Sequence, residues 1–274
     1  MAGHVLLSRL REEGYTVYGT SRFADHYHEP DIYSFDASDD GSWFRFFDTF
    51  DDLDVVVNCI GVLTKAAEKN PSNATRINVL LPNFLESYYK NSSVKVVQIS
   101  TDCVFNGLRG EYTTDMWPNE THIYGRSKAF GEIINSKDLT IRTSIIGLEL
   151  EDKPNSADNC GLLHWFLSRP RGSQISGYSE CYWSGISTLE LADAIVWYLN
   201  NPACGLHHVS RRSPISKFEL LVLANEIFDR GVIIVKDSEK VIDKGLTPSQ
   251  GSYTIRRTYR QMLKRLRDGN GLIS

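Results

Sequence analysis

Two short runs of apolar residues set the strongest constraint on how this chain can fold. Residues 55–57 are three valines in the stretch DVVVNCIG, and residues 94–99 read VKVVQI. Such runs are typical of strands that are buried on both faces of a parallel sheet. A helical pattern over residues 70–89 separates them, and another covers residues 124–135. This alternation predicts an α/β fold, a Rossmann-like doubly wound parallel sheet.

The other elements follow from the same kinds of pattern. We expect a polar loop at residues 149–159, and Thr188 and Ser216 are expected to cap helices, Ser216 forming a capping box with Glu219. Further strands are expected over residues 16–20, 32–35, 139–144 and 205–209, and further helices over residues 4–13, 162–168, 188–200 and 216–228.

Composition excludes several classes of protein. The formal net charge of −4 leaves no basic excess for gripping nucleic acid. No apolar run approaches ~18 residues, so no membrane partner is expected. The 5 cysteines show no CxxC pattern and no signal peptide is visible, which predicts no metal site and favours a cytoplasmic protein. The basic residues within 256–267 favour a solvated helix face over a phosphate-binding patch.

The beginning of the chain departs from the doubly wound pattern. Such a domain starts with a strand, then a Gly-rich turn, then a helix, whereas this sequence opens on the helix at residues 4–13. The first strand normally lies in mid-sheet, and its loss leaves backbone groups that cost about 1–3 kcal/mol each when buried and unpaired. We therefore expect this strand and its turn to be missing, as in a frame truncated at an internal Met, with Gly3 as the turn's last glycine.

The rhythm of strands and helices also predicts two domains. Residues 1–147 are expected to form a nucleotide-binding Rossmann-like domain that lacks its first strand, and residues 181–209 are expected to return to it. Residues 148–180 and 210–274 are expected to form a small C-terminal substrate-binding lobe.

Three residues carry the chemistry that the sequence predicts. Thr101 directly follows the buried run, and Tyr124 and Lys128 lie four apart at the start of a predicted helix, where they share one face. A Lys ammonium stabilises a phenolate, so it lowers the pKa of Tyr from about 10 and makes Tyr a usable proton donor for carbonyl reduction. The Thr hydroxyl can hydrogen-bond the same carbonyl oxygen. A YxxxK pair alone is a weak signal, but its place one strand after Ser-Thr-Asp strengthens it.

The motifs around these residues resemble those of a known family. Residues 100–105 read STDCVF, residues 124–132 read YGRSKAFGE, and residues 142–144 read RTS. This series is similar to the STDxVF, YGxSKxxGE and RTS motifs of the dTDP-4-dehydrorhamnose reductases, which are extended short-chain dehydrogenases/reductases. The resemblance runs from about residue 3 to at least residue 228.

The resemblance implies roles at matching positions. Thr101 would bind the substrate carbonyl, Tyr124 would donate the proton, and Lys128 would lower the pKa of Tyr124 and hold the nicotinamide ribose. Asn78 matches an Asn that supports the active-site strand. The cofactor-binding set is Gly3, Ser21, Arg22, Asp36, Ala37, Asn58, Gly61, Tyr124 and Lys128, and the substrate-binding set is Thr101, Asp102, Val104, Phe105 and Trp183.

The end of the strand at residues 16–20 favours NADPH. Ser21 and Arg22 follow it, and a hydroxyl and a guanidinium suit a ribose 2′-phosphate. Sites that prefer NADH place a carboxylate there. Asp25 lies close by, so NADH stays open as an alternative.

These features together predict an NADPH-dependent reductase of the 4-keto group of a nucleotide-linked 6-deoxy sugar, for polysaccharide precursor synthesis. A homodimer is compatible with the sequence. Two alternatives stay open: an epimerase or reductase of another nucleotide sugar, and a non-catalytic nucleotide-binding regulatory subunit of the same fold.

Overall fold

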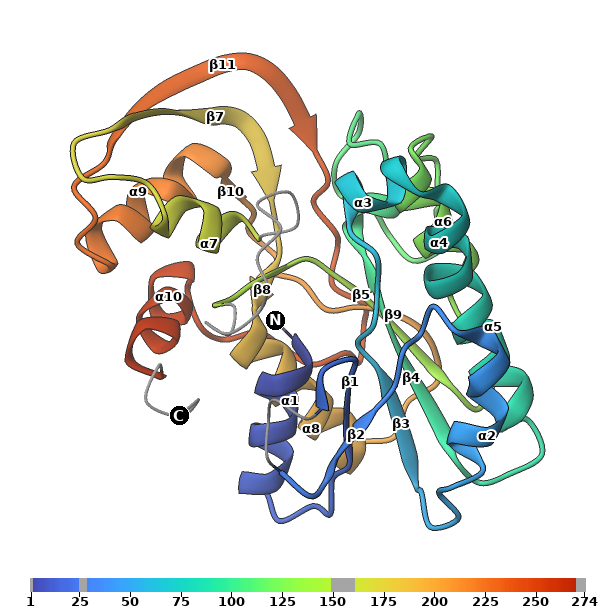
Figure 1. Ribbon diagram of the computed structural model, residues 1–274. Coiled ribbons are helices and arrows are strands. Elements are labelled where there is room, and N and C mark those ends of the chain that lie inside the picture. Colours follow the sequence, from blue (N-terminus) through green and yellow to red (C-terminus); the bar gives the residue numbers. More distant parts are fainter. Residues whose placement is uncertain (1, 25–28, 149–160, 270–274) are drawn as a thin grey trace.

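A computed structural model describes residues 2–24, 29–148 and 161–269 (Figure 1). Its centre is a parallel sheet with the strand order β3-β4-β5-β9. The bounds of these strands are β3 Val55–Asn58, β4 Lys95–Thr101, β5 Leu139–Thr143 and β9 Gly205–His208. The predicted α/β fold with a parallel central sheet is therefore confirmed.

The two apolar runs are buried from both sides, as predicted. On β4, Val96 packs into the core beneath α5 while Val97 packs into the core beneath α8, and the two are 0% and 2% exposed. Figure 1 shows the two layers of helices on opposite faces of the sheet. One layer holds α1 Ala2–Glu12 and α8 Thr188–Asn200; the other holds α2 Trp43–Phe47, α3 Thr64–Lys69, α4 Pro71–Thr75, α5 Leu81–Tyr88 and α6 Ile123–Phe130.

A second, smaller parallel sheet lies at the N-terminal side. It consists of β1 Gly19–Ser21 and β2 Ile32–Ser34. Among the described residues these two strands pair only with each other, and β3 pairs only with β4. The short helix η2 Asp40–Ser42 follows β2.

The C-terminal lobe is built on a three-stranded mixed sheet, β10-β7-β11. Strand β11 runs parallel to β7, and β10 runs antiparallel to it. A two-residue parallel pair, β6–β8, lies between the lobe and the central sheet. The bounds are β6 Ile145–Ile146, β7 Gln174–Trp183, β8 Ile186–Ser187, β10 Ile215–Ser216, β11 Ile233–Asp243, α7 Leu162–Leu167, α9 Lys217–Ile227 and α10 Tyr259–Asp268.

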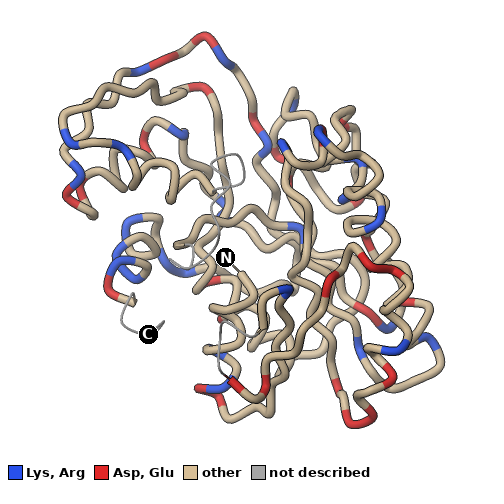
Figure 2. The backbone as a smooth tube through the Cα atoms, in the orientation of Figure 1, with Lys and Arg blue, Asp and Glu red and all other residues tan. Residues whose placement is uncertain are grey.

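Lys and Arg residues gather along α10 (Figure 2). Arg265 lies 2.5 Å from Asp193 on α8, and Arg260 lies 2.5 Å from Glu226 on α9. Arg257, just before α10, lies 2.9 Å from Glu190. These arginines therefore join α10 to the two neighbouring helices.

Two local predictions are wrong in detail. The helix expected over residues 124–135 ends at Phe130, because the chain turns at Gly131. The cap of α8 is Ser187, whose hydroxyl accepts the Glu190 N–H, rather than Thr188. The capping box of Ser216 and Glu219 is confirmed. The loop expected at residues 149–159 lies outside the described residues.

Candidate active site

The predicted trio meets where β4 ends and α6 begins. Thr101 is the last residue of β4 and caps the short helix η4 Asp102–Val104. Its hydroxyl donates to Asp102 Oδ1 at 3.1 Å and accepts from the Cys103 N–H at 3.1 Å. Tyr124 and Lys128 lie one turn apart on α6, and the Tyr124 hydroxyl interacts with Thr101. The structure thus brings the three side chains together.

Gly125 lets α6 approach η4 this closely. A Cβ atom at this position would lie 2.1 Å from the Cys103 carbonyl oxygen and 2.4 Å from Cγ of Glu120. Such contacts are far inside van der Waals distance, so any larger residue would push the helix away from η4. The glycine after Tyr124 in the motif therefore has a steric reason.

The expected effect of Lys128 on Tyr124 does not occur in this structure. Burial raises the pKa of Tyr124, and the neighbouring Cys103 and Asp102 raise it further, while the Thr101 hydrogen bond opposes them. Lys128 Nζ instead donates to the carbonyl oxygen of Ile99 at 2.7 Å. The prediction of a lowered Tyr124 pKa is wrong here because desolvation of the phenol, added to the charges of Cys103 and Asp102, outweighs the Thr101 hydrogen bond.

Lys128 is itself strongly perturbed. Its side chain is buried among α6, β4 and the turn after β3, and this burial lowers the pKa of Lys128 to about 8. Glu132 and Cys59 oppose the shift. A Cβ atom at Gly61 would lie 3.9 Å from Lys128 Nζ, so the ammonium faces that glycine.

Asn78 ties the turn after β3 to α6. Its Oδ1 accepts from the Val62 N–H at 2.8 Å, and its Nδ2 donates to the Val62 carbonyl at 3.1 Å and to Ser127 Oγ at 3.0 Å. Asn78 lies in a π-helical segment, η3 Arg76–Leu80, between α4 and α5. Single π-turns of this kind are frequent at functional sites. The sequence predicted a continuous helix here and missed the π-turn.

The other expected cofactor positions lie at the carboxyl ends of β1, β2 and β3. Asn58 Nδ2 donates to Gln98 Oε1 at 2.8 Å, and a Cβ atom on Gly3 would lie 3.9 Å from Cys59 Cβ. The start of α1 therefore faces the turn after β3, which also contains Gly61.

Ser21 and Arg22 follow the smaller sheet. Arg22 is exposed and its charge lowers the pKa of Asp36, although the main cause of that shift is the Ser38 N–H hydrogen bond. Ala37 beside it is buried. Asp25, the residue that keeps NADH open, lies outside the described residues.

Several of the expected substrate contacts are buried. Val104 and Phe105 are both 0% exposed, and the Phe105 ring stacks on Tyr112 with centroids 4.0 Å apart. Trp183 is buried against Tyr259, with ring centroids 5.6 Å apart. Asp102 is also buried, and burial raises its pKa. Their place in substrate binding stays a prediction.

The sequence analysis missed a buried ion pair behind the trio. Arg142 and Glu132 form a two-point pair at 2.7 Å, with side chains 2% and 3% exposed. Both residues were visible as motif positions, but nothing in the spacing indicated that they bind each other.

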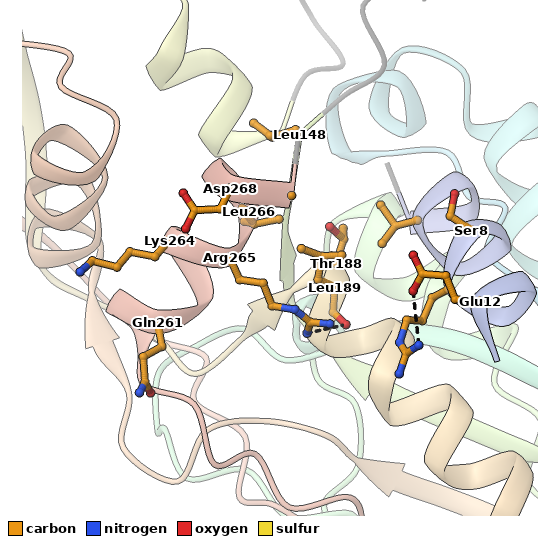
Figure 3. Close-up of a pocket in the computed structure, with 13 residues that line it drawn as sticks. Ser8, Glu12, Leu148, Thr188, Leu189, Gln261, Lys264, Arg265, Leu266 and Asp268 are labelled. Carbon is orange, nitrogen blue, oxygen red and sulfur yellow. Dashed lines mark hydrogen bonds and ion pairs between the residues drawn. The ribbon is translucent and has the colours of Figure 1, made fainter. Parts of the chain in front are cut away.

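Two pockets lie away from the trio. Figure 3 shows one of about 510 Å³ between α1, α8 and α10, lined by side chains that include Ser8, Thr188 and Leu266. A second is lined by residues of α9 and the segment before it. Neither is lined by Thr101, Tyr124 or Lys128. In the part of the chain described here, no cluster of His, Cys, Asp and Glu suits a metal ion, and no helix is long and apolar enough to cross a membrane.

Known proteins share this architecture. A solved structure of a hypothetical dTDP-4-dehydrorhamnose reductase from Sulfolobus tokodaii is 26% identical, covers 93% of this chain and 94% of its own, and gives a TM-score of 0.74. The dTDP-4-dehydrorhamnose reductase of Bacillus anthracis, solved with NADP, is 20% identical. It covers 98% of this chain and 95% of its own, with a TM-score of 0.77. Among curated proteins, the probable low-salt glycan biosynthesis reductase Agl14 of Haloferax volcanii is 25% identical over 223 residues, which are 79% of this chain and 73% of that protein.

The parallel sheet and the Thr-Tyr-Lys arrangement at its strand ends define an extended short-chain dehydrogenase/reductase, a class of oxidoreductase. Within that class, residues 1–149 match the family described as the RmlD substrate binding domain, and the chain belongs to this family.

Proposed function

We propose that this protein reduces the 4-keto group of a nucleotide-linked 6-deoxy sugar with NADPH. The observation that carries the proposal is the meeting of Thr101, Tyr124 and Lys128 at the carboxyl end of β4. Ligands of open α/β sheets bind at the carboxyl ends of the strands. The relatives named as dTDP-4-dehydrorhamnose reductases, one of them holding NADP, support the sugar class and the cofactor.

The nicotinamide end of the cofactor fits the residues at this edge. Gly61 and the start of α1 at Gly3 leave exposed backbone beside the site, and Lys128 Nζ faces the same space. Lys128 would hold the ribose hydroxyls, and Asn58 and Gly61 would lie along the dinucleotide. Arg22 and Ser21 would bind the 2′-phosphate, since a guanidinium is well suited to phosphate.

The protein residues supply the proton and the orientation for the reduction. When bound, the cofactor supplies a hydride to C4 of the sugar. Tyr124 gives its phenolic proton to the carbonyl oxygen, which becomes a hydroxyl, and the Thr101 hydroxyl would turn its one proton from Asp102 Oδ1 to that oxygen. Because burial raises the pKa of Tyr124, the phenol keeps its proton until charge develops on the carbonyl oxygen.

An epimerase or a reductase of another nucleotide sugar would use the same three residues. A regulatory nucleotide-binding subunit is the second candidate, and it would need no buried Tyr–Lys pair. The pair is present and packed, with Lys128 6% exposed, which favours the enzyme.

The test is NADPH oxidation with dTDP-4-dehydrorhamnose by the protein and its Tyr124→Phe variant. Loss of the proton donor is expected to lower kcat by about 10²–10⁴-fold, with NADPH binding retained. Tyr15→Phe, which changes an exposed ring elsewhere, is the control. NADPH binding without turnover by the unaltered protein would favour the regulatory reading, and turnover by Y124F would remove Tyr124 from the chemistry.

A further inference from the structure

A buried polar row crosses the sheet directly behind the trio. Ser100, Arg142 and His208 are cross-strand neighbours on β4, β5 and β9, and all three are 4% exposed or less. Glu132, which follows α6, binds both Ser100 and Arg142 of this row. Its Oε1 accepts from Ser100 Oγ at 2.6 Å and from Arg142 Nε at 2.7 Å, and its Oε2 accepts from Arg142 Nη2 at 2.7 Å.

The segment that carries Lys128 and Glu132 holds β4 at two successive residues. Lys128 Nζ donates to the Ile99 carbonyl at 2.7 Å, and Glu132 accepts from the Ser100 hydroxyl. The next residue is Thr101. Each of these is a hydrogen bond to a charged group, which is stronger than a neutral one. The position of Thr101 relative to α6 is therefore fixed by the two residues before it.

The far side of the row fixes Arg142. His208 Nδ1 donates to the carbonyl oxygens of Tyr112 at 3.1 Å and Thr247 at 3.2 Å, so Nε2 carries the lone pair that faces Arg142 Nη1 at 3.4 Å. Burial, together with the Arg142 charge, lowers the pKa of His208 to about 4. The histidine is neutral at pH 7, and Glu132 is the anion that binds Arg142.

The negative charge of Glu132 also acts on Lys128. Among the groups around Lys128, Glu132 is the chief one that favours its charged form. Burial raises the pKa of Cys59 to about 11 and of Cys103 to about 12, so both thiols are neutral at pH 7. Among the described residues, other charged or titratable groups near the trio include Tyr124 on the same helix, Asp102 on η4, Arg142 on β5, Lys244 after β11, Glu120 before α6 and Lys217 on α9.

We propose that Glu132 is a positioning residue, which holds the end of β4 against α6 and places a negative charge on the segment that carries Lys128. This rests on the proposed function, because it acts through Thr101 and Lys128. As an ammonium, Lys128 has three N–H donors, so with one given to the Ile99 carbonyl it keeps two for the ribose hydroxyls. Burial alone would favour the neutral amine.

The test is the titration of Lys128 followed by NMR in protein with ¹³C-labelled lysine, in the absence of cofactor and substrate. Lys128→Arg identifies the signal. Glu132→Gln is expected to lower the Lys128 titration midpoint by about one pH unit, a tenfold change in its ionisation. Glu132→Asp, which keeps the charge, is expected to restore most of it. Glu239→Gln, on the exposed part of β11, is the control and leaves the midpoint unchanged.

Two further variants separate charge from position. Ser100→Ala keeps the charge of Glu132 and removes only its bond to β4, so it is expected to lower kcat several-fold without moving the Lys128 midpoint. Arg142→Gln frees the Glu132 carboxylate from its partner, so the Lys128 midpoint is expected to rise. If E132Q does not fold, the shift of the Lys128 midpoint in R142Q still tests the proposal.

An unchanged Lys128 midpoint in folded E132Q would overturn the proposal, as would a fall or no change in R142Q. Because the titration needs no turnover, it can succeed when reductase activity is absent. That result would reject the proposed function and leave the electrostatic role of Glu132 standing.

Discussion

The two parallel sheets of this protein differ sharply in how firmly they are held. In the four-stranded sheet, β4 and β5 each have a partner on both sides, and Val96 and Ile141 on them are 0% exposed. The β1–β2 sheet has three residue pairs and none of its residues is fully buried. The first sheet carries Thr101 and the second carries Ser21. The strand end at Thr101 is therefore held by deep packing, whereas the strand end at Ser21 belongs to a short, exposed sheet.

Truncation of side chains gives the largest expected contrast. Ile141→Ala on β5 is expected to cost about 2–5 kcal/mol of unfolding free energy, because it leaves a cavity in a closed core. Val55→Ala on β3, which pairs on one side among the described residues and is half-buried, is expected to cost about 1 kcal/mol. Urea denaturation of both variants measures the difference, and equal costs would show that the β3 edge is as tightly packed as the interior.

Acid sensitivity of the four-stranded sheet is the next effect. Because the pKa of His208 falls from 6.5 to about 4 on folding, the unfolded state binds a proton between these pH values that the folded state does not. The contribution of His208 to the free energy of unfolding is then fully present above about pH 6.5, and it falls by up to about 3 kcal/mol as pH drops toward 4. His208→Gln should flatten this dependence in denaturation curves, whereas the exposed His122→Gln should not. If the unfolding free energy of H208Q varies with pH as it does in the unaltered protein, other groups cause the dependence.

A smaller loss is expected where α6 ends. A Cβ atom at Gly131 would lie 1.9 Å from the Asn78 carbonyl oxygen, so Gly131→Ala must displace the backbone and is expected to cost about 1–3 kcal/mol. Gly41→Ala has room, with its nearest contact at 3.5 Å, and serves as the control in thermal melts. If G131A and G41A have the same melting temperature, the end of α6 accommodates the added methyl group without loss of stability.

The residues that follow β1 should respond least. Arg22→Ala is expected to raise the KM for NADPH about tenfold relative to that for NADH, which corresponds to about 1.4 kcal/mol, while the melting temperature stays the same because Arg22 is exposed. Steady-state kinetics with both cofactors measure it. An equal change for both cofactors would mean that Arg22 does not select the 2′-phosphate.

The sequence by itself determined the features that depend on near neighbours. The runs at residues 55–57 and 94–99 specified buried parallel strands, Ser216 and Glu219 specified a helix start, and the spacing of Tyr124 and Lys128 specified a shared helix face. These follow from backbone periodicity and from hydrogen bonds that span three or four residues, so they can be read along the chain.

Only the tertiary structure decided what burial and distant partners do. It raised the pKa of Tyr124 where the sequence predicted a fall, it turned Phe105 into a core residue, and it joined Glu132 to Ser100 on another strand. It also separated β1 from β3 among the described residues. Desolvation and strand neighbours depend on residues that are remote in sequence, and local patterns carry no information about how such residues meet.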